Sequence, residues 1–243
     1  MSHGCKLEFA PALFLACALT ACAMRPSPPA GVVSAPAPAP IARTGRPYDV
    51  IGERSLLTLR VYRAGTLASA GHNHLIASHT LAGTVYLPDD VLEASFELHL
   101  AVAELTVDER ELRAREPGSD FPPEVPQSAR DGTRRNMLGP AVLDADDYPE
   151  VVLESVALAG ATPAQPGMLT ASIAAEVRGQ WHTVHMPLHY ALAGGTLTVT
   201  GEAPLKQSEL GLTPFTALMG ALAVQDEMRL EVRIVARAAQ TAH

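Results

Sequence analysis

The main part of this 243-residue chain has no cysteine. Its three cysteines, Cys5, Cys17 and Cys22, all lie close to the N-terminus. A folded body without cysteine has no thiolate for a nucleophile or a zinc site, and it contains no disulfide. Its stability must therefore come from a hydrophobic core, and 47% hydrophobic residues are enough to build one.

The chain also lacks an excess of positive charge and the common catalytic motifs. Its formal net charge is -8 and its pI is near 5.6, so no basic patch for nucleic acid or an anionic membrane surface is expected. It contains no Gly-x-Ser-x-Gly, no His-Glu-x-x-His and no glycine-rich phosphate loop. These absences predict that the protein is not an enzyme.

The N-terminal segment predicts export. Residues 10–21 form an apolar run that is too short to span a membrane but is typical of a signal peptide. The run ends in Leu19-Thr20-Ala21-Cys22, which resembles the lipobox of bacterial lipoproteins and implies a signal peptide over 1–21 and a lipid on Cys22. Ala23 follows where the inner-membrane retention signal has aspartate, which favours the outer membrane and a periplasmic location. The alternative is an ordinary signal peptide with a chance cysteine.

Residues 22–47 are rich in proline and alanine and include three Ala-Pro pairs over 35–40. Such a sequence builds no core and tends to an extended polyproline conformation of about 3 Å per residue. We interpret it as a tether that holds a domain above the membrane, with a disordered tail as the alternative. The single folded domain is then expected over residues 48–240.

Period-two alternation of apolar and polar residues runs through most of that domain. It predicts strands near residues 57–62, 81–87, 96–102, 151–159, 168–177, 183–192, 197–203 and 228–236. Helix-forming residues predict a helix over 127–138 and a charged one over 108–116, and the apolar segment 210–222 is expected to cover one end of the sheet as a loop or short helix. The fold class is therefore all-β, an antiparallel barrel or sandwich of about eight strands with one or two short helices.

A barrel of this size either holds one small apolar ligand or is filled by its own side chains. Aromatic residues make up only 5% of the chain, and small aliphatic linings leave space that large rings would fill. The inward-facing apolar residues predicted to bind a ligand are Leu59, Val61, Val85, Phe96, Leu98, Leu100, Val184, Met186, Leu188, Phe215, Leu218 and Met219.

Histidines provide the second candidate site. His72, His74 and His79 lie in one turn-and-strand region, and two imidazoles at i and i+2 are suited to zinc, copper or haem iron if a third ligand joins them. The alternative is that they stabilise the turn through hydrogen bonds. His185 and His189 are expected to face solvent, because their neighbours Val184, Met186 and Leu188 face inward.

The order of several short motifs resembles the YceI family of polyisoprenoid-binding-like proteins. These motifs are Tyr48-Asp49-Val50, Gly83-Thr84-Val85, Arg130-Asp131, Tyr148-Pro149-Glu150-Val151, Glu154-Ser155, Val177-Arg178-Gly179, Pro187-Leu188 and Ser208-Glu209-Leu210-Gly211-Leu212. The resemblance covers nearly the whole folded part and implies an extended, lipocalin-like antiparallel β-barrel. It also implies an elongated apolar channel for a polyprenyl-type lipid, in a periplasmic or secreted protein. The chain departs from the family in an insertion-like stretch over 116–128 and in Gly71-His72-Asn73-His74.

The leading hypothesis is a lipid-anchored envelope protein that carries or sequesters a long apolar molecule, such as a polyisoprenoid or quinone-like lipid. One alternative is a metal- or haem-binding protein that uses His72 and His74. Another is a ligand-free structural or interaction module. No nucleic-acid partner is expected, and the sequence does not specify an oligomeric state.

Overall fold

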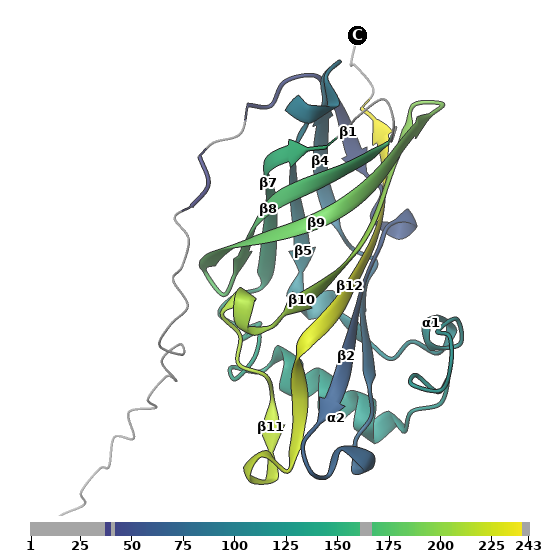
Figure 1. Cartoon of the computed structure of the whole chain (residues 1–243), viewed down its shortest axis with the longest axis vertical. Coiled ribbons are helices and arrows are strands. Elements are labelled where there is room, and N and C mark those ends of the chain that lie inside the picture. The colour runs from purple at the N-terminus through teal and green to yellow at the C-terminus, as the bar shows by residue number, and fades with distance from the viewer. Residues whose placement is uncertain (1–36, 40–41, 161–166, 240–243) are drawn as a thin grey trace, which may run out of the picture.

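The computed structural model describes residues 37–39, 42–160 and 167–239 (Figure 1). The predicted signal peptide, Cys22 and most of the predicted tether lie outside these residues. None of the helices in the described ranges is both long and apolar enough to cross a membrane.

The described residues form one antiparallel sheet of twelve strands. The strands are β1 (Arg46–Val50), β2 (Leu56–Ala64), β3 (His74–Ser78), β4 (Ala82–Leu87), β5 (Ser95–Ala101), β6 (Thr106–Val107), β7 (Glu150–Ala159), β8 (Met168–Val177), β9 (Gln180–Ala193), β10 (Thr196–Lys206), β11 (Thr216–Ala217) and β12 (Leu222–Ala238). Two α-helices accompany them, α1 (Arg110–Arg113) and α2 (Gln127–Leu138).

Strand β1 closes the sheet into a barrel because it pairs on both sides. Tyr48 lies opposite Val85 of β4 and also opposite Ala238 of β12. The ring of eight strands runs β1, β4, β5, β7, β8, β9, β10, β12 and back to β1. The predicted all-β, lipocalin-like barrel of about eight strands with one or two short helices is therefore confirmed.

The longest strand, β12, extends the barrel beyond this ring. Its last residues pair with β1, while its earlier residues, from Ala223 to Arg233, pair with β2. Strands β3 and β6 then continue the sheet from the other edge of β2. As Figure 1 shows, the result is an elongated molecule, with α2 crossing the lower part of the barrel wall.

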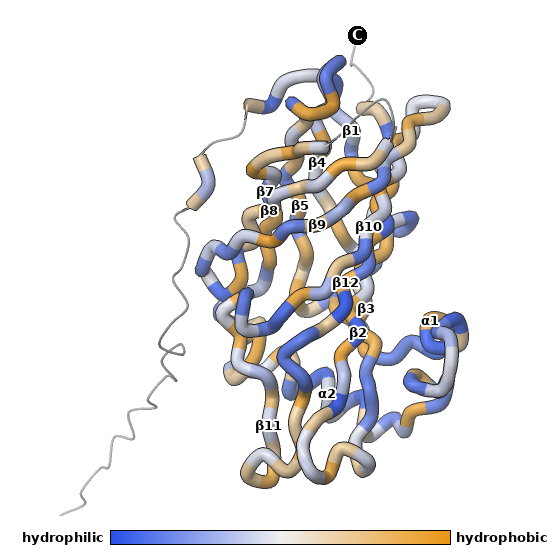
Figure 2. The backbone as a smooth tube through the Cα atoms, in the orientation of Figure 1, coloured by the Kyte–Doolittle hydropathy of each residue, from blue (hydrophilic) through white to orange (hydrophobic). Residues whose placement is uncertain are grey.

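The expected alternation accounts for most of the strands. In β9, Met186 is buried while His185 and His189 are exposed on the outer face, as predicted. Figure 2 shows the same change between apolar and polar residues along the strands. The β8–β9 turn is tighter than predicted, because Arg178 and Gly179 both have positive φ and form a two-residue hairpin turn, so β9 begins at Gln180.

The helices and the segment near residue 215 differ in how well they match expectation. Helix α2 has the predicted bounds, whereas α1 is only four residues long and covers less than half of the predicted 108–116. The segment 210–222 contains the short strand β11, which pairs with the start of β12 to form a hairpin. This hairpin extends past the barrel wall at the lower end of the molecule (Figure 1).

Candidate functional site

The barrel encloses an apolar cavity of about 430 Å³. This volume lies within the range of about 300–1,000 Å³ that is typical of small-molecule sites. Ten of the twelve predicted lining residues line the cavity: Leu59, Val61, Val85, Phe96, Leu98, Leu100, Val184, Met186, Leu188 and Phe215. Their role in binding remains a prediction, and period-two alternation placed all of them except Phe215 on the inner face.

The other two predicted lining residues, Leu218 and Met219, do not line the cavity. Leu218 is 65% exposed and Met219 is fully exposed. Both have left-handed backbone conformations, with φ values of 50° and 54°, and together with Gly220 they form the turn that leads back into β12. Their apolar character suggested an inward position, but the turn directs them away from the barrel.

Polar groups gather at one end of the cavity. The lining there includes Tyr62, Arg63 and Gly71 at the end of β2 and its loop, His72 and His74 around the start of β3, and Thr133 and Asn136 of α2. No aspartate or glutamate is among the described lining residues, although the chain as a whole is acidic. This end of the cavity can therefore offer hydrogen-bond donors and positive charge to a ligand without an acidic side chain in the wall.

The sequence prediction missed Arg63, Thr133 and Asn136, although signals for all three were present. Arg63 has the same parity as the inward-facing residues of β2, so alternation places it on the inner face. Thr133, Asn136 and Met137 are spaced i, i+3 and i+4 on one face of α2, and all three line the cavity.

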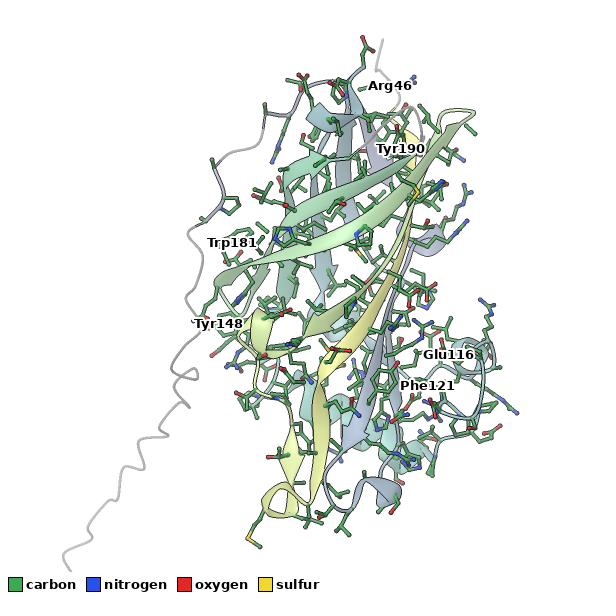
Figure 3. All side chains as sticks on the ribbon, viewed as in Figure 1. Arg46, Glu116, Phe121, Tyr148, Trp181 and Tyr190 are labelled. Atoms are coloured by element: carbon green, nitrogen blue, oxygen red, sulfur yellow. The ribbon has the colours of Figure 1, made fainter. Side chains whose placement is uncertain are left out.

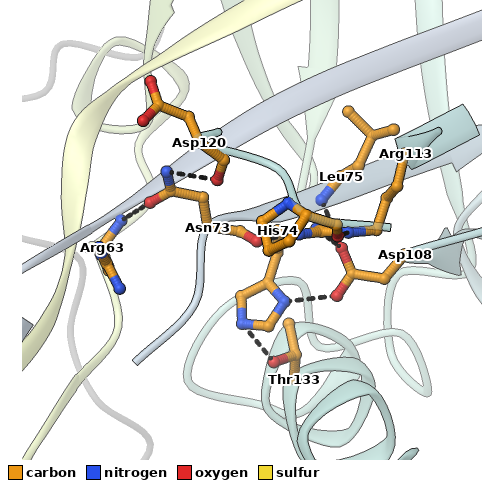
Figure 4. A network of polar contacts seen from close by, with 9 residues as sticks. Arg63, Asn73, His74, Leu75, Asp108, Arg113, Asp120 and Thr133 are labelled. Carbon is orange, nitrogen blue, oxygen red and sulfur yellow. Dashed lines mark hydrogen bonds and ion pairs between the residues drawn. The ribbon is translucent and has the colours of Figure 1, made fainter. Parts of the chain in front are cut away.

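A hydrogen-bond network fixes His74 at this end of the cavity (Figure 4). Its Nδ1 lies 2.6 Å from Oδ2 of Asp108, and its Nε2 lies 3.1 Å from the Thr133 hydroxyl. The other carboxylate oxygen of Asp108 accepts hydrogen bonds from the backbone N–H of Leu75 and from the guanidinium of Arg113. The network therefore joins β3 to α2 and to the segment that carries α1.

The carboxyl group of Asp108 is held in its charged form. Burial alone would raise its pKa, but the hydrogen bonds from His74 and the Leu75 N–H, together with the positive charge of Arg113, lower it below the ordinary value. A charged Asp108 accepts a hydrogen bond from the Nδ1–H of His74. In neutral His74, Nε2 is then the acceptor for the Thr133 hydroxyl.

The segment between β6 and α2 packs on the outside of β2, where Figure 3 labels Glu116 and Phe121. Glu116 accepts two hydrogen bonds from Arg60, at 2.7 and 2.9 Å, and both side chains are largely buried. The rings of Phe121 and Tyr62 meet edge to face, with their centroids 5.7 Å apart. The guanidinium carbon of Arg113 lies over the Phe121 ring, 5.5 Å from its centroid. These contacts hold the predicted insertion against the barrel wall.

The structure does not bring the three candidate metal-binding histidines together. The rings of His72 and His74 are 6.1 Å apart, but His79 faces away and pairs with Glu109 at 3.0 Å. Both nitrogens of His74 already have protein partners. Across the described residues, no group of three or more His, Cys, Asp or Glu side chains is arranged to hold a metal ion.

Comparison with known proteins gives a consistent result. A family model described as a YceI-like domain matches residues 64–236. A search of the curated proteins found no significant match.

Two solved structures have a similar fold. BcnA from Burkholderia cenocepacia is 19% identical, with a TM-score of 0.55 over 77% of this chain and 99% of that one. A polyisoprenoid-binding domain from Saccharophagus degradans, described as implicated in plant cell wall breakdown, is 11% identical, with a TM-score of 0.51 over 79% of this chain and 98% of that one. At these identities the structures support the fold alone, while the family model spans most of the barrel, so the chain belongs to the YceI family.

Proposed function

We propose that this protein binds a long apolar lipid of the polyisoprenoid type inside its barrel. The observation that carries this proposal is the apolar cavity, whose wall is built from aliphatic side chains of nine of the twelve strands. The Saccharophagus degradans domain, which has a similar fold, is a polyisoprenoid-binding domain, and this supports the same ligand class here. No group in the apolar wall is suited to catalysis, so binding alone is the proposed activity.

The physical gain from such binding is sufficient. A lipid tail that buries about 400 Å² of apolar surface gains about 10 kcal/mol at about 25 cal/mol per Å². An association cost of about 4 kcal/mol, the low end of the usual range, leaves about 6 kcal/mol, which corresponds to a Kd of about 40 μM.

The polar end of the cavity indicates the orientation of the ligand. Arg63 and His72 provide donors there, and the described lining has no carboxylate to repel an electron-rich headgroup. We therefore expect the headgroup, such as a phosphate or a quinone carbonyl, to lie beside His72 and the tail to extend toward β4 and β10.

We further propose that the protein acts as a carrier or sequestering protein in the bacterial periplasm, tethered to the outer membrane through a lipid on Cys22. The support for this location is the lipobox-like sequence after the apolar run and the proline-rich segment before β1. Globomycin-sensitive processing and metabolic labelling of the full chain with a radioactive fatty acid test it. Label that persists after Cys22→Ser would contradict it.

Organic extraction of the purified full-length protein, followed by mass spectrometry, tests the binding proposal. We expect a prenyl-type lipid that is enriched over a mock purification from cells lacking the protein. Repeated extraction without any enriched lipid, together with no uptake of added polyprenyl lipid, would contradict it.

A further inference from the structure

Two loops at the lower end of the barrel form an uncharged, apolar tip. One loop follows β2 and covers residues 65–71, and the other covers residues 211–221 around β11. The backbone N–H of Leu67 donates to the carbonyl of Ala221 at 2.8 Å, so the two loops lie side by side. We call these residues the apolar tip, and Figure 1 shows them at the end of the molecule below α2.

The composition of the apolar tip is unusual for this chain. Residues 64–71 and 210–225 contain no Asp, Glu, Lys or Arg, although 18% of the chain is charged. Figure 2 shows the loop below β11 in pale to orange colours. Three large apolar side chains are exposed there, namely Leu67 at 46%, Leu218 at 65% and Met219 completely. Apolar side chains gathered in this way at the end of a soluble domain are typical of an interaction site.

The backbone that holds the side chains of Leu218 and Met219 outward is strained. Leu218 and Met219 both occupy the left-handed region, which is disfavoured for residues with a Cβ atom. A turn built from Gly or Asn would avoid this strain, so the turn geometry by itself does not favour two large side chains at these positions.

The apolar tip is continuous with the cavity. Gly71 and Phe215 in the two loops, and Ala64 and Leu222 directly beside them, belong to the cavity lining. The lining also reaches the exposed Arg63, which lies opposite Val224 at the base of the tip. A lipid that leaves the cavity at this end therefore passes next to the tip.

We propose that the apolar tip inserts into the acyl region of a lipid bilayer and places this end of the cavity against the membrane. Long, flexible, uncharged side chains partition into the interface between headgroups and acyl chains. Arg63 lies at the depth of the headgroups in this orientation and can contact their phosphates. Asp226, an acidic residue next to the tip, accepts two hydrogen bonds from Ser208, so its carboxylate is directed back into the protein. An apolar ligand then exchanges with the bilayer without crossing water.

A site-specific fluorescence experiment tests this proposal independently of lipid anchoring and of ligand binding. The full chain carries Cys5→Ser, Cys17→Ser and Cys22→Ser, and one new cysteine from Met219→Cys is labelled with nitrobenzoxadiazole. The matched control places the label by Val156→Cys, because Val156 is 56% exposed on β7 of the barrel wall. Each protein is mixed with vesicles of phosphatidylethanolamine and phosphatidylglycerol with and without brominated acyl chains.

At position 219 we expect a blue shift and quenching of at least about twofold by brominated chains, with little change at position 156. Equal quenching at both positions, or no quenching at 219 while the protein sediments with the vesicles, would overturn the proposal. A blue shift at 219 that rises with protein concentration in the absence of vesicles would also overturn it, since a second copy of the chain would then cover the tip.

Discussion

The side chains of His74 and Asp108 form a largely buried pair in which Nδ1 of His74 lies 2.6 Å from Oδ2 of Asp108. The same carboxylate neutralises Arg113, whose side chain is completely buried. The histidine and the aspartate are 34 positions apart in the chain, and their contact connects β3 to the α1 segment, while the second ring nitrogen of His74 connects it to Thr133 of α2. The pair therefore links the polar end of the cavity to its supporting structure.

Asp108→Asn is expected to destabilise the protein strongly. Asparagine tolerates the left-handed backbone at this position, where φ is 55°, so the substitution removes mainly the charge. The buried Arg113 guanidinium would then have no counter-ion, which typically costs about 3–5 kcal/mol. Urea unfolding monitored by circular dichroism measures this loss.

Asp144→Asn provides the matched control for that measurement. Asp144 also has a left-handed backbone, but its contact with Arg178 is long, at 3.8 Å, and partly exposed. We expect a cost below about 1 kcal/mol there. Similar losses in the two variants would contradict the view that Asp108 compensates a buried charge.

Gly83 is expected to tolerate no side chain. Its φ is 131°, and a Cβ atom there would overlap the carbonyl oxygen of Glu97 and approach Leu98 Cα to 2.9 Å. Gly118→Ala is the control, because Gly118 also has positive φ but open space around it. We expect Gly118→Ala to cost about 1 kcal/mol of unfolding free energy and Gly83→Ala at least about twice as much. Thermal unfolding of both variants measures these losses. Equal losses would mean that backbone strain alone is responsible, and a larger loss for Gly83→Ala would show the added effect of the overlap with Glu97.

The sequence was sufficient to predict those parts of the fold that depend on local periodicity. Alternation predicted β2 and seven of the eight strands of the ring, together with nine of the residues that line the cavity, and helix propensity gave α2 with its observed bounds. It did not reveal that β1 pairs with both β4 and β12, because closure depends on partners that are distant in the chain.

The candidate site was less predictable for the same physical reason. A run of apolar residues does not indicate on which side of a turn each one emerges, so Leu218 and Met219 were placed in the cavity although the left-handed turn exposes them. The histidine spacing suggested a metal site, but the carboxylates that pair with His74 and His79 come from the segment after β6. Only the tertiary structure brings these groups together.

His182 is expected to make the protein less stable in acid. Burial lowers its pKa below the ordinary value, although a hydrogen bond with the backbone of Glu209 opposes this effect, and Nε2 has no partner among the described groups. The folded state therefore binds the proton of His182 more weakly than the unfolded state does. The contribution of neutral His182 to the free energy of unfolding is fully present above the ordinary pKa of about 6.5, and it is lost as the pH falls through the folded pKa.

Urea midpoints at about pH 7.5 and about pH 5.5 measure this effect across the range in which a histidine titrates. The fall in midpoint should be smaller in His182→Phe, which keeps a ring against Gly211, than in the wild type. His185→Gln is the control, since His185 is exposed on the same strand and should leave the fall unchanged. An undiminished fall in His182→Phe would mean that other groups cause the acid sensitivity.

His72 is expected to contribute to headgroup recognition. It lines the polar end of the cavity, and the loss of one ligand hydrogen bond by His72→Leu should weaken binding by about 1 kcal/mol, or about fivefold. The weakening should appear for a polyprenyl phosphate and be absent for a hydrocarbon of the same length in a fluorescent-probe displacement assay. His189→Leu on the outer face is the control, and an equal loss for both ligands would contradict a headgroup contact.

Filling the cavity should abolish ligand binding without unfolding the barrel. Ile173 lines the cavity and is only partly buried, so the indole of Ile173→Trp would occupy space that the proposed lipid tail needs. Overpacking costs about 1–3 kcal/mol of stability, and the binding affinity should fall at least about tenfold. Thr183→Trp is the control, because Thr183 is exposed on β9 next to Val184, which is the register partner of Ile173. Titration with a fluorescent polyene fatty acid measures the binding affinity of each variant, and extraction measures the amount of lipid that co-purifies with it. Unchanged binding in a folded Ile173→Trp protein would place the ligand outside the barrel.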